Sequence, residues 1–237
     1  MAQIRFPATA GARLRLGSSV LTAAKSVNTR PVQARLDAFG RAQRSYAAAQ
    51  ERVDAAEAAL RAAQAKVAQR DREQDEAVEL LARALVAEGQ SRAKPFAGCG
   101  GPTPAALTRL SMAEEAQQIH ALVTALQRNP GCSKATQQAS EVAEKAARAV
   151  EKAMAPITAL EAAVSQARQA RDALAQTWEK ALAGLKRGAR AAVDEGEPYL
   201  YATLFGQAMA AGSRNGKRAP DTPAPPAPPA PSAPNGA

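Results

Sequence analysis

The apolar positions of the chain repeat with a seven-residue period over two long stretches. In residues 31–88 a large apolar side chain recurs every seven residues, and a small one, mostly alanine, follows three residues later. Two such positions in each heptad line up as one stripe along a helix. The large positions are Phe39, Tyr46, Val53, Leu60, Val67 and Leu81. The pattern predicts a long helix over 31–88 with one apolar seam.

The second stretch, residues 134–190, has the same period. Its large positions are Val150, Ile157, Val164, Trp178 and Leu185. Pro156 lies inside the pattern, and a proline removes one helical hydrogen bond and clashes with the preceding turn. The sequence therefore predicts a second long helix that is kinked or split near Pro156.

Polar side chains interrupt both seams, at Arg70, Gln74 and Arg171. A polar residue in a seam can set the register or the choice of partner at a cost in stability. If the two helices are antiparallel with matched ends, Arg171 lies near Glu51, Asp54 and Glu57. We expect one of these carboxylates to pair with Arg171, or else the guanidinium to reach solvent.

Residues 89–133 connect the two helices. Gly89 ends the first helix, and Thr103 followed by Pro104 is typical of a helix start, which predicts a cap helix over about 104–128. Ser111 and Glu114 have capping-box spacing, so a fresh helix can begin there. The fold class predicted is all-α: a long antiparallel helical hairpin, coiled-coil-like, with an alanine-rich seam, a short helical cap and flexible N- and C-terminal segments.

The two ends differ from the middle. Residues 1–30 are basic, and Pro7, Gly11 and Gly17 should interrupt any amphipathic helix, so we expect a basic arm; a transit peptide is the alternative. Residues 213–237 are rich in proline and alanine and predict a disordered tail. That tail is either a spacer or a ligand for an aromatic-lined groove.

Residues 192–211 are expected to form a short aromatic-bearing helix. Tyr199, Tyr201 and Phe205 are three of the eight aromatic residues in the chain. In one interpretation this helix packs back onto the base of the hairpin. In the other its aromatic side chains are interaction candidates that dock on another protein.

Composition narrows the function classes. The chain of 237 residues is 46% hydrophobic but only 3% aromatic, and 62 of its residues are alanine. The net charge is +9, of which six positive charges and no acid fall in residues 1–36. The middle of the chain is almost neutral, so any attraction to nucleic acid or to an anionic membrane surface must come from the ends.

The sequence is poor in reactive groups. It has one histidine, His120, and two cysteines, Cys99 and Cys132, which we expect to be free thiols, a bridge between them being the alternative. Asp71 and Asp75 share a helical face that could hold a divalent cation, but a solvated charged face is the expectation. Phosphate-loop, dinucleotide and zinc-protease motifs are absent. The sequence predicts no enzyme, cofactor or metal.

These features favour a non-enzymatic structural or protein-interaction protein. We expect it to self-associate as a homo-oligomer or to scaffold a helical partner, and we expect it in the cytoplasm. No apolar run reaches the roughly 20 residues that span a bilayer. The alternative is an electrostatic binder of nucleic acid or anionic membrane surface that uses the basic arm and tail.

Overall fold

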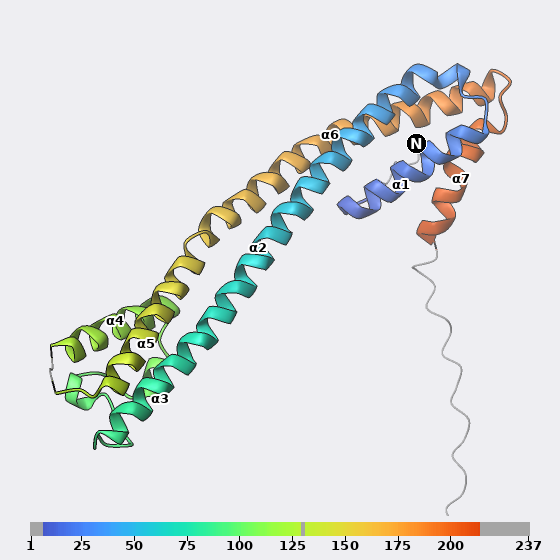
Figure 1. Cartoon of the computed structure of the whole chain (residues 1–237). Coiled ribbons are helices and arrows are strands. Elements are labelled where there is room, and N and C mark those ends of the chain that lie inside the picture. The colour runs from blue at the N-terminus through green and yellow to red at the C-terminus, as the bar shows by residue number, and fades with distance from the viewer. Residues whose placement is uncertain (1–6, 129–130, 214–237) are drawn as a thin grey trace, which may run out of the picture. The chain divides into compact units, whose positions relative to one another are not determined.

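The described part of the chain is helical. The computed structural model describes residues 7–128 and 131–213, with side chains up to residue 206, and contains no strand within these ranges. The helices are α1 (Ala10–Ala23), α2 (Gln33–Ala87), α3 (Pro104–Leu107), α4 (Met112–Gln127), α5 (Lys134–Met154), α6 (Ile157–Asp194) and α7 (Leu200–Ser213), joined in places by the 3₁₀ turns η1 (Ala24–Ser26), η2 (Arg30–Val32) and η3 (Ala97–Cys99) (Figure 1). The all-α prediction is confirmed. Of the predicted tail, residues 214–237 lie outside the described residues.

The chain divides into two compact units. The first contains residues 1–40 and 181–237, and the second contains residues 41–180. The division falls inside α2 and inside α6, so each long helix contributes to both units.

The second unit contains the predicted antiparallel pair. Gln43 of α2 contacts Trp178 of α6, and further along α2 Glu57 contacts Arg168. The residue number of the contact rises along α2 while it falls along α6, so the two helices are antiparallel. Alanine at the second seam position allows this pairing, because small side chains let helix axes approach to the low end of the usual ~8–10 Å range.

Trp178 anchors one end of this pair. Its side chain is fully buried, and its indole Nε1 donates a hydrogen bond of 2.6 Å to Oε1 of Gln43, which is also buried. The Tyr46 ring centroid lies 6.3 Å from that of Trp178. A buried tryptophan requires a partner for its N–H, and Gln43 supplies it from the facing helix.

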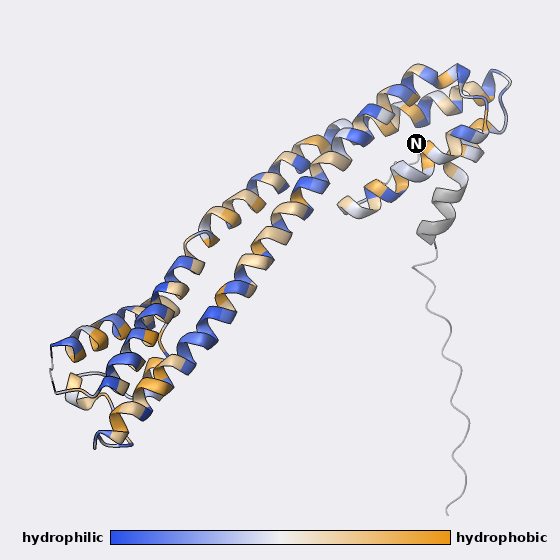
Figure 2. Ribbon diagram, viewed as in Figure 1, coloured by the Kyte–Doolittle hydropathy of each residue, from blue (hydrophilic) through white to orange (hydrophobic). Residues whose placement is uncertain are grey.

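The other end of the second unit carries a helical cap. Here α4 and α5 pack on the end of α2 around an apolar cluster, which gathers as orange ribbon in Figure 2. The cluster contains Val78, Leu81, Leu85, Phe96, Leu107, Ile119, Leu122, Val123 and Leu126, with alanines from α2, α4 and α5 between them. Most large apolar residues of the connector are thus buried in this cluster, whereas Leu110 is 37% exposed.

The predicted cap helix over 104–128 is two helices. The chain breaks between Leu107 and Met112, and the capping box at Ser111 and Glu114 is formed: the Ser111 hydroxyl accepts from the Glu114 N–H, and the Glu114 carboxylate accepts from the Ser111 N–H. This reciprocal cap supplies the start of α4 with partners for otherwise unpaired N–H groups.

Pro156 splits the second long helix. α5 ends at Met154 and α6 begins at Ile157, as the sequence predicted for a proline at this place. Regular bonding resumes at once, since the Leu160 N–H donates to the Pro156 carbonyl over 3.0 Å.

Glu88 fastens the end of α2 to the start of α5. Its Oε1 accepts hydrogen bonds from the Ser133 N–H at 2.8 Å and from the Thr136 hydroxyl at 2.6 Å. Ser133 is also the N-cap of α5, with its hydroxyl accepting from the Thr136 N–H. A carboxylate at a helix N-terminus is favoured by the unpaired N–H groups and the helix dipole. The contact closes the hairpin across a separation of 45 residues.

The first unit corrects the expectation for residues 1–30. Instead of an arm without a stable helix, Ala10–Ala23 form α1, whose N-cap is Thr9, and α1 packs against α7. Pro7 precedes the cap and so removes no helical hydrogen bond. Gly17 is buried in the packed face together with Val20. Two glycines in a helix weaken it, but tertiary packing overrides that propensity.

The predicted aromatic helix over 192–211 begins later than expected. α6 continues to Asp194, and a turn follows in which Gly196 has a φ of 107°, a conformation that favours glycine. α7 then starts at Leu200, so Tyr199 lies just before the helix rather than within it.

The Glu88 contact predicts a pH dependence of stability. Hydrogen bonds from Ser133 and Thr136 lower the pKa of Glu88 below its ordinary value. A lowered folded-state pKa contributes stability that is present at neutral pH and is lost as the pH falls through the folded pKa. Replacing Glu88→Gln should therefore lower the unfolding temperature at pH 7, with the difference from wild type shrinking on acidification.

Thermal unfolding followed by circular dichroism between pH 3 and 7 measures this difference. Glu141→Gln, which removes an exposed charge from α5, is the matched control and should show a smaller difference. A Glu88→Gln difference that stays constant across this pH range would contradict the assignment.

Candidate functional site

Exposed alanines form a stripe on each helix in the middle of the second unit. On α2 they are Ala55, Ala58, Ala59, Ala62 and Ala65, and on α6 they are Ala159, Ala162, Ala163, Ala170 and Ala173. Spacings of three, four and seven residues place each set on one side of its helix. These side chains face solvent and take no part in the seam.

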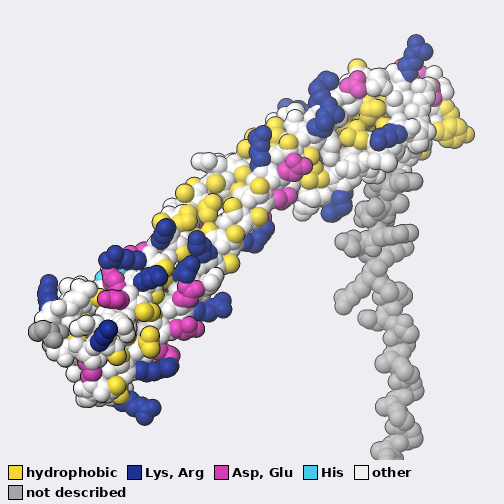
Figure 3. All heavy atoms as spheres, viewed as in Figure 1, with side chains coloured by type: hydrophobic (Ala, Val, Ile, Leu, Met, Phe, Trp, Pro, Cys, Tyr) yellow, Lys and Arg dark blue, Asp and Glu magenta, His cyan; other side chains and the backbone are white. Residues whose placement is uncertain are grey.

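The two stripes lie on the same face of the pair. At about 100° per residue, each stripe is rotated from its seam in the same sense and by a similar angle. A two-fold axis perpendicular to the plane of the two helix axes exchanges antiparallel helices. A stripe that lies on one side of this plane on α2 therefore lies on the same side on α6. We call this surface the alanine face. Figure 3 shows apolar side chains gathered over the middle of the α2–α6 pair.

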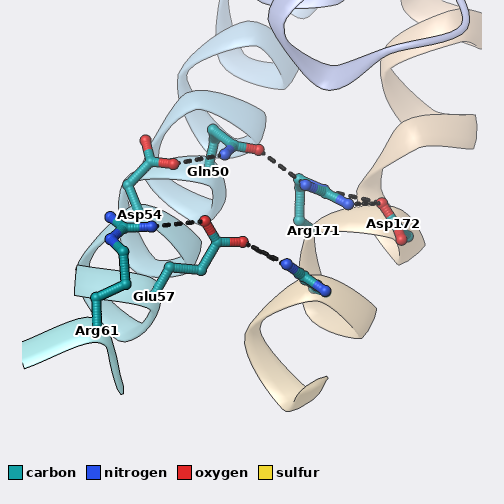
Figure 4. A network of polar contacts seen from close by, with 7 residues as sticks. Gln50, Asp54, Glu57, Arg61, Arg171 and Asp172 are labelled. Carbon is teal, nitrogen blue, oxygen red and sulfur yellow. Dashed lines mark hydrogen bonds and ion pairs between the residues drawn. The ribbon is translucent and has the colours of Figure 1, made fainter. Parts of the chain in front are cut away.

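The opposite face of the pair carries charge. Arg168 donates to Oε1 of Glu57 through Nη2 at 2.7 Å and through Nε at 3.2 Å, and Arg61 lies 3.7 Å from the other Glu57 oxygen (Figure 4). An open groove of about 510 Å³ lies here, with Leu60 and Val164 at its apolar side. The pair therefore carries the Glu57–Arg168 ion pair on one face and two stripes of exposed alanine on the other, where Lys66 and Gln166 are the exposed polar side chains among the alanines.

Arg171 does not pair with Glu51, Asp54 or Glu57 as expected, and its side chain is 18% exposed, so the alternative of a guanidinium that reaches solvent is met only in part. Its guanidinium pairs at 2.8 Å with Asp172 on its own helix and donates at 3.0 Å to Gln50 (Figure 4). Gln50 in turn donates to Asp54 at 2.8 Å, so a glutamine stands between Arg171 and the expected carboxylate. Glu57, the third candidate, forms its ion pair with Arg168 instead. The predicted register was right to within one helical turn.

The predicted seam positions differ in burial. Phe39, Tyr46, Val53, Val67, Leu81, Val150, Val164, Trp178 and Leu185 are buried. Leu60 and Ile157 are only half-buried, and both belong to the middle of the second unit. Two helices alone do not cover the seam there.

The polar seam positions have different environments. Gln74 is fully buried, and neither atom of its amide makes a hydrogen bond. Arg70 is half-buried and pairs with Glu73 on its own helix. The hydrogen bond from Arg70 is the first of the contacts that lower the pKa of Glu73.

The three aromatic interaction candidates of the first unit differ in how exposed they are. Phe205 is buried, and the Tyr201 ring lies 5.2 Å from it, with the Arg190 guanidinium 4.9 Å above Tyr201. Tyr199 is 77% exposed. Packing onto the unit thus accounts for Phe205, and Tyr199 is the aromatic side chain free to meet another molecule.

His120 joins α4 to α5. Its Nδ1 lies 2.6 Å from Glu144, and its Nε2 lies 3.4 Å from Glu151. Burial acts to raise the pKa of Glu144, but hydrogen bonds from His120 and Arg148 outweigh it and lower that pKa. The imidazole is held between two carboxylates, which fixes the cap helix to its neighbour.

Other reactive groups are sparse in the described ranges. Cys99 and Cys132 are free thiols, and burial raises the pKa of Cys99. Among residues 7–128 and 131–213, no set of three histidine, cysteine or acidic side chains is placed to hold a metal ion. Within the same ranges, no helix combines the length and the apolar character needed to cross a membrane.

Sequence reasoning missed two features that carry charge. The Glu88 contact joins residues 45 positions apart, and no local pattern signals it. Glu115 is the other: it follows the capping-box residue Glu114 in an acidic pair and reads as solvated, yet it is only 3% exposed. Its place on the apolar side of α4, four residues before Ile119 and seven before Leu122, is the signal that could have found it.

A comparison of the chain with models of protein families, with curated proteins and with solved structures finds no match to any of them.

Proposed function

We propose that the chain is a non-enzymatic structural protein of the cytoplasm that assembles with a second copy of itself, in coiled-coil fashion, through the alanine face. The observation that supports this proposal is the contrast between the two faces of the α2–α6 pair. One face carries the Glu57 and Arg168 ion pair, and the other presents two parallel rows of methyl groups to solvent.

Energetics favour covering that face. A buried methyl group contributes roughly 0.8 kcal/mol, whereas ordering the backbone costs about 1–2 kcal/mol per residue. Between Val53 and Val67 of α2 no side chain is fully buried, so this part of the pair contains little apolar contact. A second pair packed on the alanine face would make a four-helix layer and bury both rows.

Alanine is also the strongest helix former, so exposed alanines alone stabilise a long helix. Propensity does not explain their segregation onto one face, because it acts equally at every exposed position. Segregation of small residues does suit close packing of another helix pair. A second copy fits best, since the face is repeated on two antiparallel helices and is therefore self-complementary under a two-fold axis.

Acidic substitutions on the alanine face test this assembly. Ala59→Glu combined with Ala163→Glu places like charges on the two rows at one level of the pair. We expect the wild-type mass to rise with concentration and the variant to associate at least about tenfold more weakly, a loss of ~1.4 kcal/mol. Sedimentation equilibrium measures both.

Ala113→Glu combined with Ala121→Glu on α4 is the matched control, because these alanines are exposed but lie outside the alanine face. It should associate like wild type. A wild type that stays monomeric at every concentration, or a variant that associates as strongly as the control, would refute the proposal.

An electrostatic binder is the second candidate. Residues 7–40 hold five basic side chains and one acid, and Arg15, Lys25 and Arg30 are exposed. Such charge attracts phosphate groups of nucleic acid or of anionic lipid, with affinity that falls steeply with salt.

Replacing Arg15, Lys25 and Arg30 by Glu separates the two candidates. Under the assembly proposal, self-association survives this change, and wild type shows no salt-sensitive binding to duplex DNA or to vesicles containing phosphatidylserine. Binding measured at low and moderate salt, present in wild type and lost in the variant, would instead establish the electrostatic function.

A further inference from the structure

Three buried polar atoms in the cap have no hydrogen-bond partner. They are Nε2 and Oε1 of Gln74 on α2 and Oε1 of Glu115 on α4. Gln74 is 0% exposed and Glu115 is 3% exposed. An unpaired buried polar atom costs about 1–3 kcal/mol, so three in one place call for a chemical explanation.

The surroundings disfavour a charge on Glu115. Burial is the largest influence that raises its pKa, and the carboxylates of Asp75 and Asp71 on α2 raise it further. The Gln74 side chain, close enough to donate to the carboxylate, lowers the pKa and so opposes them. The α5 carboxylates of Glu144 and Glu151 lie against the His120 ring instead. On α4 itself, Glu114 is occupied by the capping box, while the start of the helix slightly favours a negative charge.

The neutral acid is the form that can satisfy the unpaired atoms. A carboxylate only accepts hydrogen bonds, so it leaves Oε1 of Gln74 without a donor. A protonated carboxyl offers one O–H to that oxygen, while its other oxygen accepts from Nε2 of Gln74. This reciprocal pair uses all three orphaned atoms.

We infer that Glu115 is kept as the neutral acid in a reciprocal pair with Gln74, and that this acid–amide pair is a latch that holds the cap helix α4 on α2 until the proton is lost. Ionisation removes the one donor to Gln74 and places a third carboxylate beside Asp71 and Asp75. α4 then loosens, and the apolar side chains that it packs into the cap become accessible.

The sign of the pH dependence follows from linkage. The folded protein holds the Glu115 proton more tightly than the unfolded chain does, so stability falls as the pH rises from the ordinary carboxyl range, about 4.3, towards the raised folded pKa. This is opposite to the contribution of Glu88, which is lost towards acid pH.

Infrared spectroscopy of the full chain tests the proton directly. As the pH rises from about 4, the carbonyl band of a protonated carboxyl group should persist to a higher pH in wild type than in Glu115→Gln. Glu114→Gln, which removes the adjacent exposed acid and keeps a residue suited to the capping box, should retain the band. Loss of the band at the same pH in wild type and in Glu115→Gln overturns the inference.

Hydrogen exchange of wild type tests the latch without any substitution. After correction for the intrinsic pH dependence of exchange, amides in residues 112–127 should lose at least tenfold protection between pH 5 and pH 9, relative to amides in residues 157–180. In Glu115→Gln, where the amide stays neutral, that loss should vanish. Protection of α4 that is independent of pH in wild type contradicts the latch.

Discussion

Close approach of two long helices over alanine is the constraint from which the rest of the structure follows. A methyl group at every second seam position lets the backbones come near each other, but it buries little apolar area. The second unit therefore concentrates its large side chains at its ends. Trp178 and Tyr46 pack at one end, and the cap cluster around Leu81 and Ile119 packs at the other. The middle is held mainly by polar contacts and by half-buried seam residues.

Because large apolar side chains are few in the middle, polar contacts do more to fix the register of the two helices. Gln43 fixes Trp178, Glu57 and Gln50 meet arginines of α6, and Glu88 closes the end of the hairpin. Each joins residues far apart in sequence, so together they select one register where an alanine seam alone would tolerate several. The alanine-rich composition also leaves methyl groups exposed on the outer surface, where a second helix pair could pack on them.

The heptad pattern predicted the two long helices, and their matched lengths around a short connector predicted the antiparallel hairpin. The break at Pro156 and the new helix at Ser111 depend on local proline and capping chemistry, which the sequence also shows. The sequence prediction failed for α1, where contacts with α7 outweigh two glycines. It also failed for the partner of Arg171 on α2, which is Gln50, the residue just before the first of the expected acids. Glu115 was missed because side-chain burial at the cap depends on where α4 docks. The opposite pKa shifts of Glu88 and Glu115 likewise follow from tertiary contacts between distant segments.

Distance measurement between spin labels at Arg61 and Ser165 tests the central claim most directly. Both residues line the groove over the seam. Each is replaced by cysteine to carry a label, and Cys99 and Cys132 are replaced by serine so that the two new cysteines are the only thiols that react. With an excess of unlabelled chain, antiparallel pairing within one chain predicts a separation near the helix spacing of about 8–10 Å plus the label arms. A long separation, or a short one that disappears on dilution with unlabelled chain, would contradict it.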